Sequence, residues 1–276
     1  MTTFRFYVKV SRPMQLTLAG VAAYAAFLLS NGPNWITTEK LAVFVVMALQ
    51  TFSSSVWHYG ARSDIYAKKW WDPVYVRNPW RLLMIGGTGF FLSILLAAIY
   101  LPAVCVGICI ANTVIILLYA KRLDRYWPWK NLFIAGVCIT PLLCGWYAGN
   151  RTSDIVMPLI IATYLTYFAR EVLKDMYDID ANRYERITMV MDWETPRCLR
   201  IAGGCLLTSA VLIAYMFQYL PPNFFIQLIL GSVGTWFTVL AIVLMFGVNL
   251  SKKYKLIDIG VILAVLSLLL VRAQMY

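Results

Sequence analysis

The sequence predicts an all-α, polytopic membrane protein, and three observations support this prediction. First, 61% of the 276 residues are hydrophobic and only 13% are charged, whereas a soluble domain carries about 25% charged residues. Second, the apolar residues form blocks long enough to cross a bilayer, which takes about 20 residues. Third, the 24 Lys and Arg residues lie mostly between these blocks. Together these features exclude a soluble globular, a disordered or a disulfide-stapled fold.

We expect one integral membrane domain over residues 1–276, with nine transmembrane helices in a single bundle. Proline cannot continue a helix, so Leu101-Pro102 and Pro221-Pro222 are expected to separate neighbouring crossings. The expected crossings are approximately residues 14–30, 37–57, 82–100, 101–119, 131–149, 155–173, 199–220, 223–248 and 256–275.

Positive charge gathers on one side of this nine-crossing arrangement. All but three of the 24 Lys and Arg residues fall in the N-terminal segment or in connections after even-numbered crossings, and the exceptions are Lys40, Arg151 and Arg272. Cytoplasmic loops collect Lys and Arg, so we expect a cytoplasmic N-terminus and an extracytoplasmic C-terminus. The same rule explains the net charge of +11, and we expect no nucleic-acid partner.

An acidic stripe follows the sixth expected crossing. Four side chains recur at i, i+4, i+7 and i+11, namely Glu171, Asp175, Asp178 and Asn182. If the helix continues, all four lie on one face. Like charges at this spacing repel each other, and a divalent cation between them removes that repulsion. Mg²⁺ fits because it prefers carboxylate oxygens and is usually completed by substrate phosphates.

Three bases flank the stripe, and they leave two interpretations open. Arg170, Lys174 and Arg183 are placed to hold phosphate oxygens directly. Alternatively, they pair with the acids of the stripe at an ordinary solvated helix end.

Residues 170–183 resemble the second aspartate-rich motif of the UbiA superfamily of intramembrane prenyltransferases, REIxKDxxDxxGDR in its archaeal lipid-ether branch. Asp175 and Asp178 match its aspartates, and Asn182 stands where its last aspartate is expected. Three further stretches agree with family motifs: Ser11-Arg12-Pro13, Arg77-Asn78-Pro79, and residues 118–123 followed by Asn131, which resemble YSxxLK…GN.

The first aspartate-rich motif departs from the family pattern NDxxDxxxD. Two registers are possible. In the first, the Asn and Asp positions are occupied by His58, Arg62 and Tyr66; in the second, they are occupied by Asp64, Lys68 and Asp72. Acids and bases together still suit a diphosphate, with less metal and more direct ion pairing. His58 is interpreted as a metal ligand, a general base or a simple polar residue near a helix end.

The resemblance implies transfer of a prenyl group from a prenyl diphosphate to a lipophilic or aromatic acceptor among membrane lipids, at a cytoplasm-facing site with Mg²⁺ as cofactor. It implies catalytic roles for Asp175, Asp178 and Lys121. The expected metal ligands are Asp175, Asp178, Asn182 and Asp64. The expected substrate-binding residues are Asp64, Arg62, His58, Lys68, Arg77, Tyr119, Arg170, Lys174 and Arg183.

Two other functions stay open at this point. The first is a terpene cyclase on the same scaffold, in which the chain's own double bond attacks the allylic cation. The second is a non-catalytic membrane protein or transporter that kept the fold, which the altered first motif favours. The stripe at Asp175 and Asp178 argues against the second, because ionisable groups near membrane depth are costly without a purpose.

The charge distribution makes a direct prediction about topology. A reporter fused before Met1 should be cytoplasmic and one fused after Tyr276 extracytoplasmic, because an odd number of crossings separates the ends. The positions are measured by accessibility of each reporter in intact cells. Both reporters on the same side would contradict the nine-crossing arrangement.

Overall fold

The computed structural model of the chain describes residues 10–30, 38–62, 79–121, 126–149, 154–179, 187–219, 224–250 and 253–273. Within these ranges the protein is helical, and its strand-like pairing is limited to an isolated bridge between Tyr126 and Ile187. The expected all-α class is confirmed.

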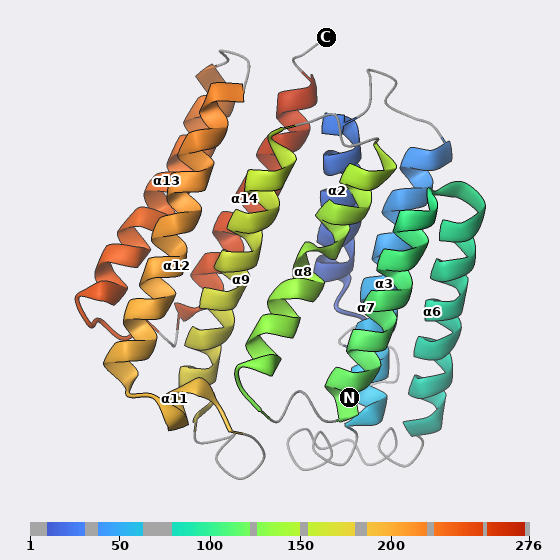
Figure 1. Cartoon of the computed structure of the whole chain (residues 1–276), viewed down its shortest axis with the longest axis horizontal. Coiled ribbons are helices and arrows are strands. Elements are labelled where there is room, and N and C mark those ends of the chain that lie inside the picture. Colours follow the sequence, from blue (N-terminus) through green and yellow to red (C-terminus); the bar gives the residue numbers. More distant parts are fainter. Residues whose placement is uncertain are drawn as a thin grey trace.

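Nine long helices make up most of the described residues, and consecutive ones run in opposite directions (Figure 1). They are α2 (Pro13–Ser30), α3 (Thr38–Ala61), α6 (Pro79–Tyr100), α7 (Ala103–Lys121), α8 (Trp129–Ala148), α9 (Val156–Tyr177), α12 (Thr195–Met216), α13 (Phe224–Met245) and α14 (Lys255–Ala273). Two short elements, α11 (Met189–Asp192) and η2 (Phe217–Tyr219), lie at the two ends of α12.

Eight of the long helices in the described part of the chain have the length and hydropathy of membrane-crossing helices. The protein is therefore an integral, multi-pass membrane protein. The ninth long helix, α14, is not among the eight, so a ninth crossing and the sides of the two chain ends stay predictions.

Two helices continue about one turn beyond the expected crossings. These crossings end near residues 57 and 173, and α3 continues to Ala61 and α9 to Tyr177. Polar side chains do not end a helix whose backbone hydrogen bonds remain satisfied. The expected break at Leu101-Pro102 is confirmed between α6 and α7, whereas Pro221-Pro222 lies outside the described residues.

Helices α2 and α8 stand in the middle of the bundle and contribute to both of its apolar cores (Figure 1). One core joins them to α9, α12, α13 and α14. The other joins them to α3, α6 and α7. Along α2, Ala22, Ala25 and Ala26 face the first core, while Ala23 and Phe27 face the second. Small side chains allow close approach of membrane helices, so α2 serves as the seam between two half-bundles.

The tightest contact at this seam is Gly145 of α8. A Cβ added there would lie against the backbone carbonyl oxygen of Ala23 and 2.9 Å from the Cβ of Ala26. A larger residue therefore has to push the two helices apart.

Buried polar side chains hold the second half-bundle together. Gln50 of α3 donates from Nε2 to Ser93 Oγ of α6 at 2.8 Å, and Asn112 of α7 donates from Nδ2 to Gln50 Oε1 at 2.9 Å. Gln50 and Ser93 are fully buried. Interhelical hydrogen bonds of this kind contribute about 1 kcal/mol each inside a membrane, so they fix the contact among α3, α6 and α7.

Substitution of Gly145 should separate the half-bundles. We expect Gly145→Val to lower the free energy of unfolding by about 1–3 kcal/mol, measured by denaturant titration in detergent micelles. Gly136→Val on the same helix is the matched control, because an added Cβ at Gly136 meets nothing within 4 Å. Equal destabilisation by both variants would show that valine's helix propensity, not the α2–α8 contact, is responsible.

Candidate functional site

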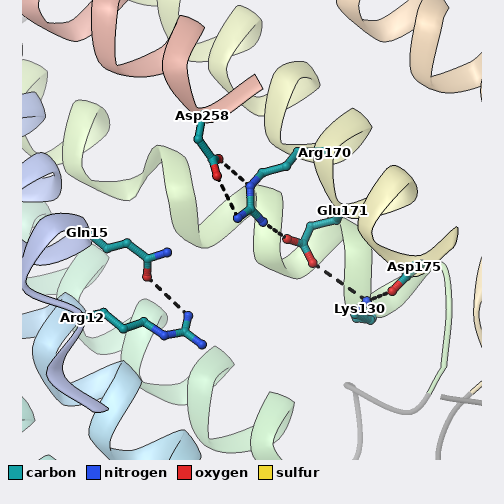
Figure 2. Close-up of polar contacts among 7 residues, drawn as sticks. All are labelled: Arg12, Gln15, Lys130, Arg170, Glu171, Asp175 and Asp258. Atoms are coloured by element: carbon teal, nitrogen blue, oxygen red, sulfur yellow. Dashed lines mark hydrogen bonds and ion pairs between the residues drawn. The ribbon is translucent and has the colours of Figure 1, made fainter. Parts of the chain in front are cut away.

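Five charged side chains from three helices form a continuous chain at the end of the bundle where α9 ends and α8 begins (Figure 2). Their charges alternate, and we call them the charge chain: Asp258, Arg170, Glu171, Lys130 and Asp175. Asp258 belongs to α14 and Lys130 to α8, while the other three belong to α9.

Arg170 is the first link, and its guanidinium is engaged by two carboxylates. Its Nε donates to Asp258 Oδ1 at 2.5 Å and a terminal nitrogen donates to Oδ2 at 3.1 Å. The other terminal nitrogen donates to Glu171 Oε1 at 2.5 Å. The paired bonds to Asp258 have the bidentate form that gives Arg–carboxylate contacts their geometric specificity.

Lys130 is the second link, and its ammonium lies between two carboxylates. Nζ contacts Asp175 Oδ1 and lies 3.9 Å from Glu171 Oε2. All three side chains are at most 2% exposed. The local fold explains this placement, because α8 begins at Trp129 and Lys130 therefore stands in its first turn. Glu171 and Asp175 are four residues apart and share the face of α9 that meets α8.

Two acids of the stripe, Glu171 and Asp175, are therefore neutralised by the protein itself. We expected like charges in the stripe to repel, but Glu171 and Asp175 share a buried ammonium. Breaking a buried pair by removing one partner is strongly destabilising. This environment explains how both carboxylates are tolerated with almost no exposure.

Helix α9 includes the first two residues of the stripe, and Asp178 stands directly after its end. Helix α9 ends at Tyr177, and Asp178 follows it as the C-cap, with its backbone N–H donating to Lys174 O at 2.9 Å. Asp178 and Lys174 are half-buried. Asn182 and Arg183 lie outside the described residues.

The carboxylates fit a divalent cation that phosphate completes. No group of three or more His, Cys, Asp or Glu side chains in the described ranges is arranged to hold a metal. However, Asp175 Oδ2 and Glu171 Oε2 are buried without a hydrogen-bond partner in the described part of the chain. Mg²⁺ usually takes one or two carboxylates plus substrate phosphates, so the donor set suits that mode rather than an all-protein cage.

Part of the first motif lies at the same end of the bundle, where α3 and α7 also end (Figure 1). The rings of His58 and Tyr119 lie 5.5 Å apart between centroids, which brings two predicted site residues together. Arg62 follows α3 and is buried. The Arg12 guanidinium lies 5.7 Å above the Tyr59 ring, and it also donates to Gln15 (Figure 2).

Other predicted residues receive no placement. Asp64, Tyr66, Lys68, Asp72 and Arg77 lie outside the described ranges. Lys121 is the last residue of α7, and its side chain is not among those described.

Two connections at this end of the bundle are fastened to each other beside Lys130. The Trp127 backbone N–H donates to Ile187 O at 3.1 Å, and its indole Nε1 donates to Asp192 Oδ2 at 2.9 Å. The Trp127 and Trp193 rings meet edge to face at 4.5 Å, and Arg197 covers Trp193 at 4.3 Å. These contacts fix the start of α8 relative to α9 and α12.

Three residues of the site are not predicted from the sequence. Lys130 lies one residue before the expected crossing at 131, so hydropathy places it in a loop. Asp258 lies inside the expected crossing 256–275, where a lone acid is itself a signal of function. Asn131 is buried, with neither amide atom hydrogen-bonded to a described residue, and only the resemblance to YSxxLK…GN points to it.

Comparison with known proteins agrees with this geometry. Residues 77–272 match the sequence model of the UbiA prenyltransferase family. The chain belongs to the UbiA prenyltransferase family. This finding confirms the resemblance and the expected enzyme class, a prenyltransferase.

Two relatives have the same name, digeranylgeranylglyceryl phosphate synthase. The protein of Methanoregula boonei is 27% identical over 65% of this chain and 64% of its own length, slightly under two thirds. The protein of Methanoculleus marisnigri is 25% identical over 76% of both chains.

Solved structures of UbiA proteins have the same fold. A digeranylgeranylglyceryl phosphate synthase in membranes superposes with a TM-score of 0.78 at 18% identity, covering 99% of both chains. A UbiA homologue from Archaeoglobus fulgidus, bound to GPP and Mg²⁺, superposes with a TM-score of 0.66 at 13% identity, covering 97% of this chain and 99% of its own. These likenesses establish the fold of this UbiA-family protein.

The link between α14 and α9 is open to a direct test. Asp258→Asn should lower the free energy of unfolding by about 1.5–3 kcal/mol, because a hydrogen bond between charged groups is lost. Denaturant titration in micelles measures this change. The control is Asp154→Asn, since Asp154 is exposed near the opposite end of α9. A change no larger than the control's would show that the Arg170–Asp258 contact contributes nothing to stability.

Proposed function

We propose that this protein transfers a prenyl group from a prenyl diphosphate to a lipophilic acceptor inside the membrane, at a site facing the cytoplasm. The observation that supports this most is Asp175, a buried carboxylate in the family's second motif whose Oδ2 has no hydrogen-bond partner among the described residues. An acceptor-only group left in this state is suited to a cation that accompanies a phosphate ligand.

The acceptor proposed first is a lipid alcohol rather than an aromatic ring. Both relatives are named after a product that has prenyl chains on glyceryl phosphate, and such a product arises when an alcohol oxygen receives the prenyl carbon. An aromatic compound is the alternative acceptor in this proposal.

Each part of the site has a role in this reaction. Asp175 and Asp178 would hold Mg²⁺ on the diphosphate, with Asp64 and Asn182 as further ligands. When bound, Mg²⁺ supplies Lewis-acid neutralisation of the leaving group. Lys174, Arg183, Lys68 and Arg77 would add ion pairs to the phosphate oxygens, whereas Arg170 is held by carboxylates and orients Glu171.

The aromatic side chains are proposed to stabilise the reacting carbon. When the C–O bond to diphosphate breaks, an allylic cation forms, and ring faces attract cations in a dry site. Tyr119 is held beside His58 and Tyr59 beside Arg12, so both lie at this end of the bundle. The acceptor oxygen then forms the new C–O bond and releases its proton.

A non-catalytic protein that kept the fold is the second candidate. The observation that favours it is Lys130, whose ammonium contacts the carboxylate expected to bind metal. The two functions differ in their products, so one experiment separates them.

Purified protein is incubated with prenyl diphosphates of several lengths, Mg²⁺, and either a lipid alcohol or an aromatic acceptor, and every product is identified. We expect a joined prenyl–acceptor product. Free diphosphate with a cyclic hydrocarbon would instead identify a cyclase, and the absence of turnover with every acceptor would support the non-catalytic protein.

Substitutions in the second motif should abolish this transfer. We expect Asp178→Asn to reduce turnover by roughly a hundred- to a thousandfold, because loss of a metal ligand removes several kcal/mol of leaving-group stabilisation. Asp175→Asn should reduce turnover at least as much, because it also leaves the buried Lys130 ammonium without its carboxylate partner. Initial rates with saturating acceptor measure the effect, and Asp154→Asn is the control at the other end of α9. Near-normal rates in both variants would contradict a metal role for these carboxylates.

A further inference from the structure

We propose that Lys130 is a resident cation of the carboxylate site, so that a divalent metal ion reaches Asp175 only by displacing the Lys130 ammonium. This inference rests on the proposed function and assigns Lys130 as a positioning residue that makes metal binding depend on the diphosphate. Its basis is the buried contact of Nζ with Asp175 Oδ1 and its 3.9 Å distance to Glu171 Oε2.

Lys130 stands where the family motif YSxxLK…GN has a glycine. In that resemblance Asn131 corresponds to the asparagine of the motif, and Lys130 corresponds to the glycine before it. This chain therefore adds an ammonium at the start of α8, directly against the second motif. The ammonium lies between Glu171 and Asp175, and Asp175 is an expected ligand of the metal ion.

Charge balance gives the consequence of this addition. The charge chain contains three acids and two bases, so its own net charge is one negative unit, and Lys174 adds positive charge close to Glu171. Without Lys130 the carboxylates would have one positive charge fewer beside them, and a divalent cation could supply it. With Lys130 present, a metal ion arriving alone meets carboxylates that are already largely neutralised, and it must also push a like charge away.

A diphosphate removes this obstacle because it gives the ammonium another partner. Lysine binds phosphate as a compact charge on a flexible four-carbon stem, so Nζ can leave Asp175 for a phosphate oxygen while the metal ion takes the carboxylate. The neighbouring Asn131 amide, buried without a described partner, is a further group at the start of α8 that suits a ligand.

Binding of Mn²⁺ to detergent-solubilised full-length protein tests the proposal, with the electron paramagnetic resonance signal of free Mn²⁺ as the readout. Wild-type protein should bind Mn²⁺ weakly alone and about tenfold or more tightly once inorganic pyrophosphate is added, with the loss of free Mn²⁺ measured against a protein-free solution that contains the same pyrophosphate. Lys130→Gln, which keeps a hydrogen-bond donor but removes the charge, should bind Mn²⁺ alone about tenfold more tightly than wild type. Lys130→Arg should remain weak.

Two controls isolate the effect. Lys253→Gln removes a positive charge from an exposed site and should leave Mn²⁺ affinity unchanged. In an Asp175→Asn background, Lys130→Gln should gain no affinity, since the ligand it releases is gone. If Lys130→Gln folds poorly, Mn²⁺ should raise its thermal unfolding midpoint, because binding to the folded state alone stabilises it.

The outcomes are distinct from those of the transfer assay. Equal Mn²⁺ affinity of wild type and Lys130→Gln without pyrophosphate would overturn the proposal, as would a wild-type affinity that pyrophosphate does not change. Lack of Mn²⁺ binding in every variant would overturn it together with the metal site. A failed transfer assay with the expected Mn²⁺ results would overturn the proposed function alone.

Discussion

A buried ammonium between two carboxylates determines how α8 and α9 meet. Burial of Lys130, Glu171 or Asp175 without an opposite charge is very costly in a low-dielectric site, so none of the three separates from the others unless a ligand supplies a replacement counter-charge. Arg170 then continues the alternation of charge to Asp258 on α14. The consecutive helices α8 and α9 and the distant helix α14 are thereby fixed to each other at a single end.

Helix packing elsewhere in the bundle brings α8 close enough to α9 for the contact between Lys130 and the two carboxylates. The small-residue seam of α2 lets α8 approach closely at Gly145, and α8 in turn reaches α9 through Lys130. On the other half-bundle, Gln50 fixes α3 against α6 and α7, which positions His58 beside Tyr119. The ion pairs at the end of the bundle therefore depend on the helix packing inside it, because the contact between α2 and α8 determines where the charged helix ends can lie.

Hydropathy predicted most of the helices, because apolar length is a direct physical requirement of the bilayer. It placed helix ends less well, and the site depends on helix ends. Lys130 belongs to α8 because this helix begins at Trp129, two residues before the expected crossing at residue 131, and as a helical residue it is buried against α9 instead of lying in a loop. The stripe also depends on a helix end, since α9 stops at Tyr177 and Asp178 is its C-cap. Partners such as Asp258, which is 88 residues from Arg170, are set by tertiary packing and leave no local pattern.

Three departures from the family motifs make this site less acidic. In the register that begins at His58, Arg62 stands at an aspartate position of the first motif; Lys130 stands where the YSxxLK…GN stretch has glycine; and Asn182 stands at an aspartate position of the second motif. Each of these three changes removes negative charge or adds positive charge, although the other register of the first motif keeps the acids Asp64 and Asp72. A site drifting out of use has no reason to shift its charge consistently. A site that still binds a diphosphate does, because protein cations take over part of the neutralisation that metal ions provide. The same substitutions that weaken a metal-only interpretation therefore strengthen the assignment of an anionic substrate.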